Sequence, residues 1–158
     1  MNNTFNAYIE SLTPAKQMIA REAVETYLRG ESEEVEKITC SNDIYKKLRY
    51  MAQYEEEHAV ILLLNQNCNI IKVKELSYGS LTCTMVDVRI IAKEAILNNA
   101  TAVILAHNHP SGNLNPSRDD NNITNKVRDG LNLLAIKLID HVIISNVGYF
   151  SYADSGRI

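Results

Sequence analysis

The sequence has few cysteines, no close pair among them, and no long hydrophobic run. The three cysteines, Cys40, Cys68 and Cys83, are widely spaced without a CxxC motif, which fits a reducing cytosol better than a disulfide framework. No basic segment followed by an apolar run opens the chain, so we expect no signal peptide. The longest apolar run, AVILLL, suits a buried strand and is far too short to span a membrane. These absences predict a cytoplasmic protein without membrane association.

An excess of positive charge is also missing. The 158 residues include 16 Lys and Arg against 19 Asp and Glu, which gives a formal net charge of -3. Such a chain has no global positive field for nucleic acid, so DNA binding is disfavoured and would need a local basic patch. With 46% hydrophobic and 22% charged residues and no internal repeat, the composition is that of an ordinary globular domain with enough apolar material for a core.

Helix-like and strand-like patterns alternate along the chain. Thr13 and Pro14 predict a helix start, and the apolar stripe that follows ends at Gly30 before an acidic run. The elements expected after that run are a helix capped by Ser41, a hairpin of strands at 58–64 and 70–76, a helix at 84–100 with a Thr84–Asp87 capping box, a strand at 101–107, a helix from Ser117, and strands at 137–145 and near the C-terminus. This alternation predicts an α/β fold, with a mixed β-sheet flanked by helices.

One polar stretch, AHNHPSGNLNPSRDD at 106–120, follows the most apolar of these strands. His107 and His109 stand two residues apart at the strand end, so alternation places both imidazoles on one face. Pro110 stops the strand, and the predicted helix start then brings Ser117 and Asp120. Two imidazoles and one carboxylate form an open ligand set for zinc, with a fourth tetrahedral position left for water, as a hydrolytic site needs.

Each part of this stretch also has a plain structural interpretation. Ser-x-x-Asp at a helix start is an ordinary capping arrangement, so Ser117 and Asp120 can be a cap alone. Asp119 is as acidic as Asp120 and competes with it for the ligand position. An isolated HxH is weak evidence, whereas the full order HxH-x7-S-x2-D at a strand end and the next helix start is specific.

The order HxH-x7-S-x2-D resembles the JAMM (MPN-plus) metalloprotease motif, and HNHPSG....PS..D is similar to its RadC-type bacterial branch. YGSLTCTMVDVR, AVILAHNHPSG and LIDHVII resemble further segments of that family. The resemblance divides the chain into an N-terminal helical extension, residues 1–37, and a RadC-like JAB/MPN domain, residues 38–158. It implies the JAB/MPN fold, a deaminase-like three-layer architecture.

The resemblance also implies roles for individual residues. His107, His109 and Asp120 would hold Zn2+, and Ser117 would help to stabilise the tetrahedral intermediate. The family uses an upstream glutamate as general base, and the alignment of the strand HAVILLLN places Glu57 there, whereas a shift of one residue would assign Glu56. The acidic triplet at 55–57 also fits a solvated turn.

Three further polar residues have structural interpretations. Asn108 and Ser111 are expected to shape the loop or face substrate. His141 lies in a predicted strand and is expected to be a hydrogen-bonded structural histidine, with a role behind the metal ligands left open.

The leading functional prediction is a zinc-dependent metallopeptidase-like hydrolase that cleaves an amide bond, peptide or isopeptide, in a peptide or protein substrate. The alternatives are a DNA-repair-associated RadC-like accessory protein and a non-catalytic MPN scaffold. The first forty residues lack the Gly-x-Gly hairpin that precedes the domain in longer RadC proteins, and every position of the metal motif is filled. Both observations favour the hydrolase.

Overall fold

The computed structural model describes residues 10–29, 36–78 and 86–158. The chain divides into two units, residues 1–35 and 36–158. In the first unit, helix α2 (Pro14–Arg29) begins at Pro14, as the sequence predicts, because proline lacks the N–H that a first helical residue leaves unused. None of the helices in the described ranges combines the length and apolar composition that crossing a membrane requires.

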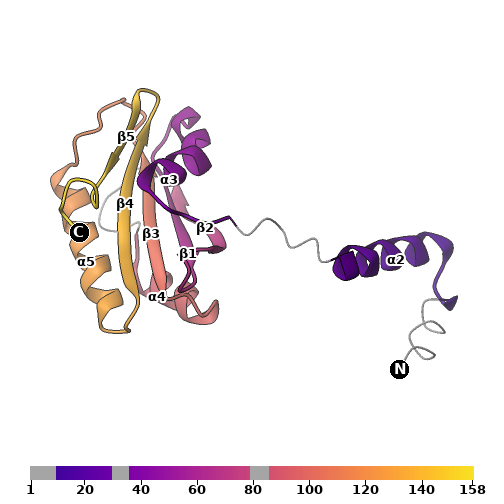
Figure 1. Ribbon diagram of the computed structural model, residues 1–158. Helices are drawn as coiled ribbons and strands as arrows, with labels where there is room; N and C mark the ends of the chain where they lie inside the picture. Colours follow the sequence, from indigo (N-terminus) through magenta and orange to yellow (C-terminus); the bar gives the residue numbers. More distant parts are fainter. Residues whose placement is uncertain (1–9, 30–35, 79–85) are drawn as a thin grey trace. The chain divides into compact units, whose positions relative to one another are not determined.

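The second unit is built on a five-stranded mixed sheet (Figure 1). The strands are β1 (His58–Leu64), β2 (Ile70–Tyr78), β3 (Ala102–Asn108), β4 (Lys137–Ser145) and β5 (Gly148–Ser151), in the spatial order β2-β1-β3-β4-β5. Strand β3 pairs antiparallel with β1 and parallel with β4, and the two outer pairs are antiparallel. All residues of β3 are buried, so the predicted central strand is confirmed.

Helices cover both faces of this sheet and make three layers. On one face, helices α4 (Val88–Leu97) and α5 (Arg118–Asn132) pack on the odd-numbered side chains of β3, such as Val103 and Leu105. On the other face, helix α3 (Ser41–Leu48) and the 3-10 helix η1 (Arg49–Gln53) pack on Ile104 and Ala106. The predicted α/β fold with a mixed sheet flanked by helices is therefore confirmed. Odd- and even-numbered residues of β3 point to opposite faces of the sheet and so contact different helix layers. This alternation determines the face on which the candidate site lies.

Two helix starts differ from the sequence prediction. Helix α4 has Asp87 as its N-cap, because the Asp87 side chain accepts a hydrogen bond from the backbone N–H of Arg89 at 2.8 Å. The predicted capping box from Thr84 to Asp87 was therefore wrong about Asp87, and Thr84 lies outside the described residues. Helix α3 has Cys40 rather than Ser41 at its N-cap position. There the carboxylate of Asp43 accepts the N–H of Cys40 at 3.2 Å, so the helix starts one residue earlier than predicted.

Candidate metal centre

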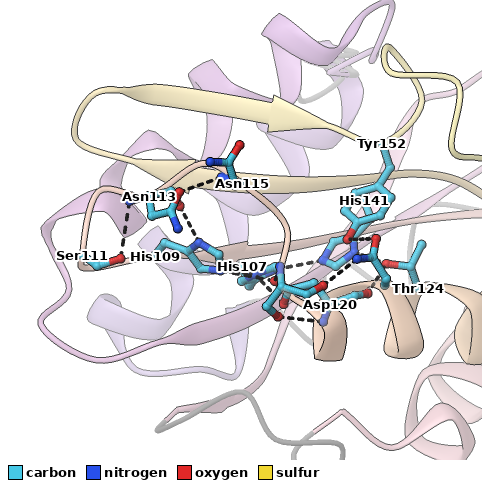
Figure 2. A network of polar contacts seen from close by, with 11 residues as sticks. His107, His109, Ser111, Asn113, Asn115, Asp120, Thr124, His141 and Tyr152 are labelled. Carbon is cyan, nitrogen blue, oxygen red and sulfur yellow. Dashed lines mark hydrogen bonds and ion pairs between the residues drawn. The ribbon is translucent and has the colours of Figure 1, made fainter.

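The end of β3 and the start of α5 bring two imidazoles and a carboxylate together. His107 continues the odd-numbered face of β3 toward α5 and is only 1% exposed. His109 follows the strand, where its N–H donates to the Ile144 carbonyl of β4 at 2.8 Å. Asp120 lies in the first turn of α5 and is 2% exposed. The structure thus assembles the three predicted ligands from two adjacent elements (Figure 2).

A tight turn after His109 directs the chain back over this site. The N–H of Gly112 donates to the His109 carbonyl at 3.0 Å, and Gly112 has a φ of +79° that disfavours other residues. The same turn brings the Asn113 carbonyl to 2.5 Å from Nδ1 of His109. Because this carbonyl can only accept, it selects a proton on Nδ1 and leaves Nε2 of His109 facing the other ligands.

The start of α5 forms the predicted helix cap with the same carboxylate that belongs to the candidate metal site. The Ser117 hydroxyl accepts the N–H of Asp120 at 3.0 Å, and the Asp120 carboxylate accepts the N–H of Ser117 at 2.7 Å. This reciprocal pair is the capping box that the sequence predicts. It also aims the Asp120 carboxylate at the two histidines and leaves Asp119 exposed and outside the group. Asp120, not Asp119, is the carboxylate of the site.

The separations of the ligand atoms suit a tetrahedral ion. Nε2 of His107 lies 3.0 Å from Nε2 of His109 and 3.2 Å from Oδ1 of Asp120. Nε2 of His109 lies 3.6 Å from Oδ2 of Asp120. Ligands bonded at about 2.05 Å to a tetrahedral zinc ion are separated by about 3.3 Å. The distance between the two histidines and the distance from each histidine to its nearer Asp120 oxygen are close to this value. The donor set and its spacing therefore fit a small dication.

The electrostatic setting of the three side chains favours a cation. Burial lowers the pKa of His107, although Asp120 and Glu57 act in the opposite direction. The hydrogen bond to Asp120 raises the pKa of His109 against the effect of burial. Burial alone would raise the pKa of Asp120, but hydrogen bonds with both histidines outweigh it and hold this pKa far below its ordinary value. The ionised carboxylate of Asp120 attracts a cation to this position, and the neutral form of each imidazole supplies the lone pair that a metal ion needs.

A second layer of buried polar groups stands behind His107. Nδ1 of His107 lies 2.8 Å from Nε2 of His141, and Nδ1 of His141 lies 2.6 Å from Oγ1 of Thr124 (Figure 2). His141 comes from β4, where it is level with Leu105 of β3 in the parallel pairing. Burial holds the pKa of His141 well below its ordinary value, so this ring is neutral. The predicted hydrogen-bonded histidine is confirmed, and the residue that it contacts is a candidate ligand.

Of the acidic triplet, only Glu57 is partly buried, whereas Glu55 and Glu56 are exposed. Ala59 pairs with His107 across β1 and β3, so the two share one face of the sheet. By alternation Glu57 continues that face just before the strand, and Glu56 the opposite one. The charge of Glu57 also acts on the pKa values of both His107 and His109.

Asn108 holds this acidic segment in place from between the two histidines. It is 1% exposed and points to the α3 face, opposite His107. Its Oδ1 accepts the N–H of His58 at 2.7 Å, and its Nδ2 donates to the carbonyl of Glu56 at 3.0 Å. These two bonds flank Glu57 on the backbone, so Asn108 orders the segment that precedes β1.

Two features of the site were not predicted from the sequence. Thr124 was not singled out, although its position four residues after Asp120 puts it on the same face of α5. The second is the bond between Asn108 and Glu56, two residues far apart in sequence, which the strand pairing alone creates.

Sequence comparison connects this geometry to a known family. The sequence model described as RadC-like JAB domain matches residues 38–157. The chain belongs to the RadC-like JAB domain family. The resemblance that the motif HxH-x7-S-x2-D suggested is thereby confirmed.

Relatives in several bacterial lineages support this membership. A UPF0758 protein of Porphyromonas gingivalis is 40% identical over 92% of this chain and 66% of its own length. The corresponding values are 37%, 92% and 62% for a UPF0758 protein of Flavobacterium johnsoniae. A UPF0758 protein of Thermotoga maritima is 33% identical over 96% of this chain and 70% of its own length. The chain thus spans about two thirds of the length of these curated relatives.

Proposed function

We propose that this chain is a zinc-dependent hydrolase that cleaves an amide bond, peptide or isopeptide, in a peptide or protein substrate. The observation that carries the proposal is the buried group of His107, His109 and Asp120, whose ligand atoms lie within 4.8 Å of one another. An open set of three ligands with a glutamate and a serine nearby is the composition of a catalytic rather than a structural zinc site.

Zinc bound here would act as a Lewis acid toward water and the scissile carbonyl. The remaining chemistry is assigned to the protein's own groups. Glu57 is proposed to take a proton from the attacking water and to pass it to the leaving nitrogen. Its half-buried position, on the His107 face and anchored on both sides by Asn108, supports this role over Glu56.

Ser117 is proposed to stabilise the developing oxyanion. Its Oγ accepts the N–H of Asp120, so the hydroxyl proton is left to donate elsewhere. Ser117 is exposed at the N-terminus of α5, where substrate can reach it and where the helix dipole favours negative charge. The same side chain can therefore cap the helix and serve the reaction.

Metal content tests the proposal first. Elemental analysis of protein purified without chelators should give about one zinc per chain, and the His109→Ala variant should lose it. Chelator treatment followed by zinc should restore the wild-type content, and Asp119→Asn is the control, since Asp119 is exposed and should retain the metal. Wild-type protein that takes up no zinc under any of these conditions would refute the proposal.

Hydrolysis is the second test. Zinc-loaded protein should cleave members of a peptide and isopeptide substrate library, and Glu57→Gln should abolish cleavage with its zinc content unchanged. Glu56→Gln is the matched control, because its side chain is exposed, and it should retain activity. Loss of activity in Glu56→Gln but not in Glu57→Gln would reassign the base. A zinc-loaded wild type that cleaves no substrate would favour the scaffold, and salt-dependent retention of duplex DNA would favour the accessory protein.

A further inference from the structure

A buried chain of hydrogen bonds runs from the side chain of one candidate ligand to the backbone of another. It starts at Nδ1 of His107, passes through both nitrogens of His141, and continues to Oγ1 of Thr124. Oγ1 of Thr124 then donates to the backbone carbonyl of Asp120 at 2.5 Å. Figure 2 shows the three side chains in line behind the site. His107, His141 and Thr124 are all buried, so these hydrogen bonds are shielded from solvent.

The direction of these bonds follows from counting protons. The Asp120 carbonyl, which only accepts, lies 2.5 Å from the Thr124 hydroxyl, so we assign the single proton of Thr124 to this bond. Thr124 must then accept from Nδ1–H of His141. The His141 ring is 0% exposed and its two nitrogens face His107 and Thr124, so it carries a single proton and its Nε2 has none. That bare Nε2 must in turn accept from Nδ1–H of His107. The lone pair that a metal ion can use is therefore on Nε2 of His107, the atom that faces His109 and Asp120.

Reversing the direction of these hydrogen bonds would block metal binding at His107. If Thr124 donated to His141, the carbonyl of Asp120 would lose its hydroxyl partner, and Nε2–H of His141 would donate to Nδ1 of His107. A neutral His107 would then carry its proton on Nε2, where a metal ion has to bind. The bond between Thr124 and Asp120 thus decides the tautomer of a residue on another element of the fold.

A stacked aromatic ring holds the plane of the His141 imidazole. Tyr152 stacks on the imidazole with ring centroids 4.9 Å apart and planes only 12° apart. The Tyr152 hydroxyl donates to Oδ1 of Asn121 at 3.1 Å, which anchors the stacked ring to α5. A ring held in this way keeps both nitrogens in line with Thr124 and His107.

We propose that His141 and Thr124 are positioning residues that select the tautomer of His107 whose Nε2 can bind the metal. The inference rests on the metal site of the proposed function and is independent of hydrolysis. Outer partners of metal-binding histidines typically change metal affinity by about 10- to 100-fold when they are removed. The expected effect is of that size and requires no contact between either residue and the metal.

Zinc affinity, measured by competition with a chelator, is the first test, on the full chain with pairs of matched variants. Thr124→Val keeps the shape but removes the hydroxyl, and should weaken zinc binding about 10-fold or more. Thr124→Ser keeps the hydroxyl and should stay within about 3-fold of wild type. His141→Leu should weaken binding about 10- to 100-fold, whereas the amide oxygen of His141→Gln can still accept from His107 and should restore most of the affinity. Equal affinity within each pair would overturn the inference.

The tautomers themselves provide a readout that simple packing does not move. In the 15N NMR spectrum of the zinc-loaded wild type, His107 should carry its proton on Nδ1 with the metal on Nε2, and His141 should be neutral with its proton on Nδ1. A proton on Nε2 of His141, or metal on Nδ1 of His107, would overturn the inference even if every variant failed to fold. Zinc binding without hydrolysis would leave this result valid while removing the proposed reaction. A wild type that binds no zinc would refute the proposed function and the inference together.

Discussion

Replacement of Asn108 by aspartate tests how the acidic segment is anchored, and it does so without knowledge of the substrate. The side chain is 1% exposed and makes three bonds to the backbone. Its Oδ1 accepts from His58 at 2.7 Å, and its Nδ2 donates to Glu56 at 3.0 Å and to Tyr54 at 3.5 Å. Asn108→Asp keeps the size of the side chain and the first bond. It replaces the donor by a carboxylate oxygen that faces the Glu56 carbonyl.

The cost can be estimated from these contacts. Loss of one hydrogen bond costs about 1 kcal/mol, and a buried charge without a full set of partners costs about 3–5 kcal/mol. Because the bond from His58 remains and solvates the carboxylate in part, we expect Asn108→Asp to lower the free energy of unfolding by about 2–4 kcal/mol at pH 7.5.

The deficit should depend on pH in a defined direction. Burial raises the pKa of the new carboxyl in the folded state above its unfolded value of about 3.9. Once protonated, the carboxyl introduced by Asn108→Asp has an O–H that can donate to Glu56 as the amide did, so acid favours the folded variant. The deficit should therefore shrink as the pH falls through the folded-state pKa, by up to about 1.4 kcal/mol per pH unit, and stop changing below about pH 3.9.

Urea denaturation of chelator-treated protein between pH 7.5 and pH 4.5 measures this effect. Asn67→Asp is the control, since Asn67 is exposed in the turn between β1 and β2 and receives the same chemical change. A deficit as small as that of Asn67→Asp, or one that stays constant with pH, would refute the anchoring of Glu57 by Asn108.

Three further predictions follow from the described contacts. Ser117→Ala should lower the free energy of unfolding by about 1 kcal/mol and abolish hydrolysis, whereas Ser117→Asn should keep the helix cap and lose only hydrolysis. Wild-type activity in both variants would remove Ser117 from the reaction. A Cβ on Gly130 would lie 2.7 Å from Cγ1 of Val88, so Gly130→Ala should destabilise the fold by about 1–3 kcal/mol in thermal unfolding, and Val88→Ala in the same chain should restore stability; additive losses would contradict this contact. Burial depresses the pKa of His141, so below about pH 6.5 the unfolded chain takes up a proton that the folded one does not, and the free energy of unfolding of the metal-free protein should fall. His141→Gln should reduce the slope of this free energy against pH by up to about 1.4 kcal/mol per pH unit. An unchanged slope would show that His141 is not the residue responsible.

Much of the candidate site could be predicted because its signals are local. The HxH spacing on a strand and the Ser-x-x-Asp spacing at a helix start each depend on a few neighbouring residues, and the structure reproduces both. The N-cap positions of Asp87 and Cys40 were not predicted, because each region offers several possible capping residues within three positions. The carboxylate of Asp43, for example, binds the N–H groups of Thr39 and Cys40, and nothing in the spacing selects those partners over others.

By itself, the sequence determined the order of helices and strands, the apolar central strand and the group of potential ligands, because side-chain periodicity and capping act over short distances. Only the tertiary structure decided which distant residues support that group. The parallel pairing of β3 with β4 brings His141 behind His107, and the antiparallel pairing of β1 with β3 brings the Glu56 backbone to Asn108. Strand order and register arise from burial of both sheet faces at once, a property of the whole core that no short stretch of residues encodes.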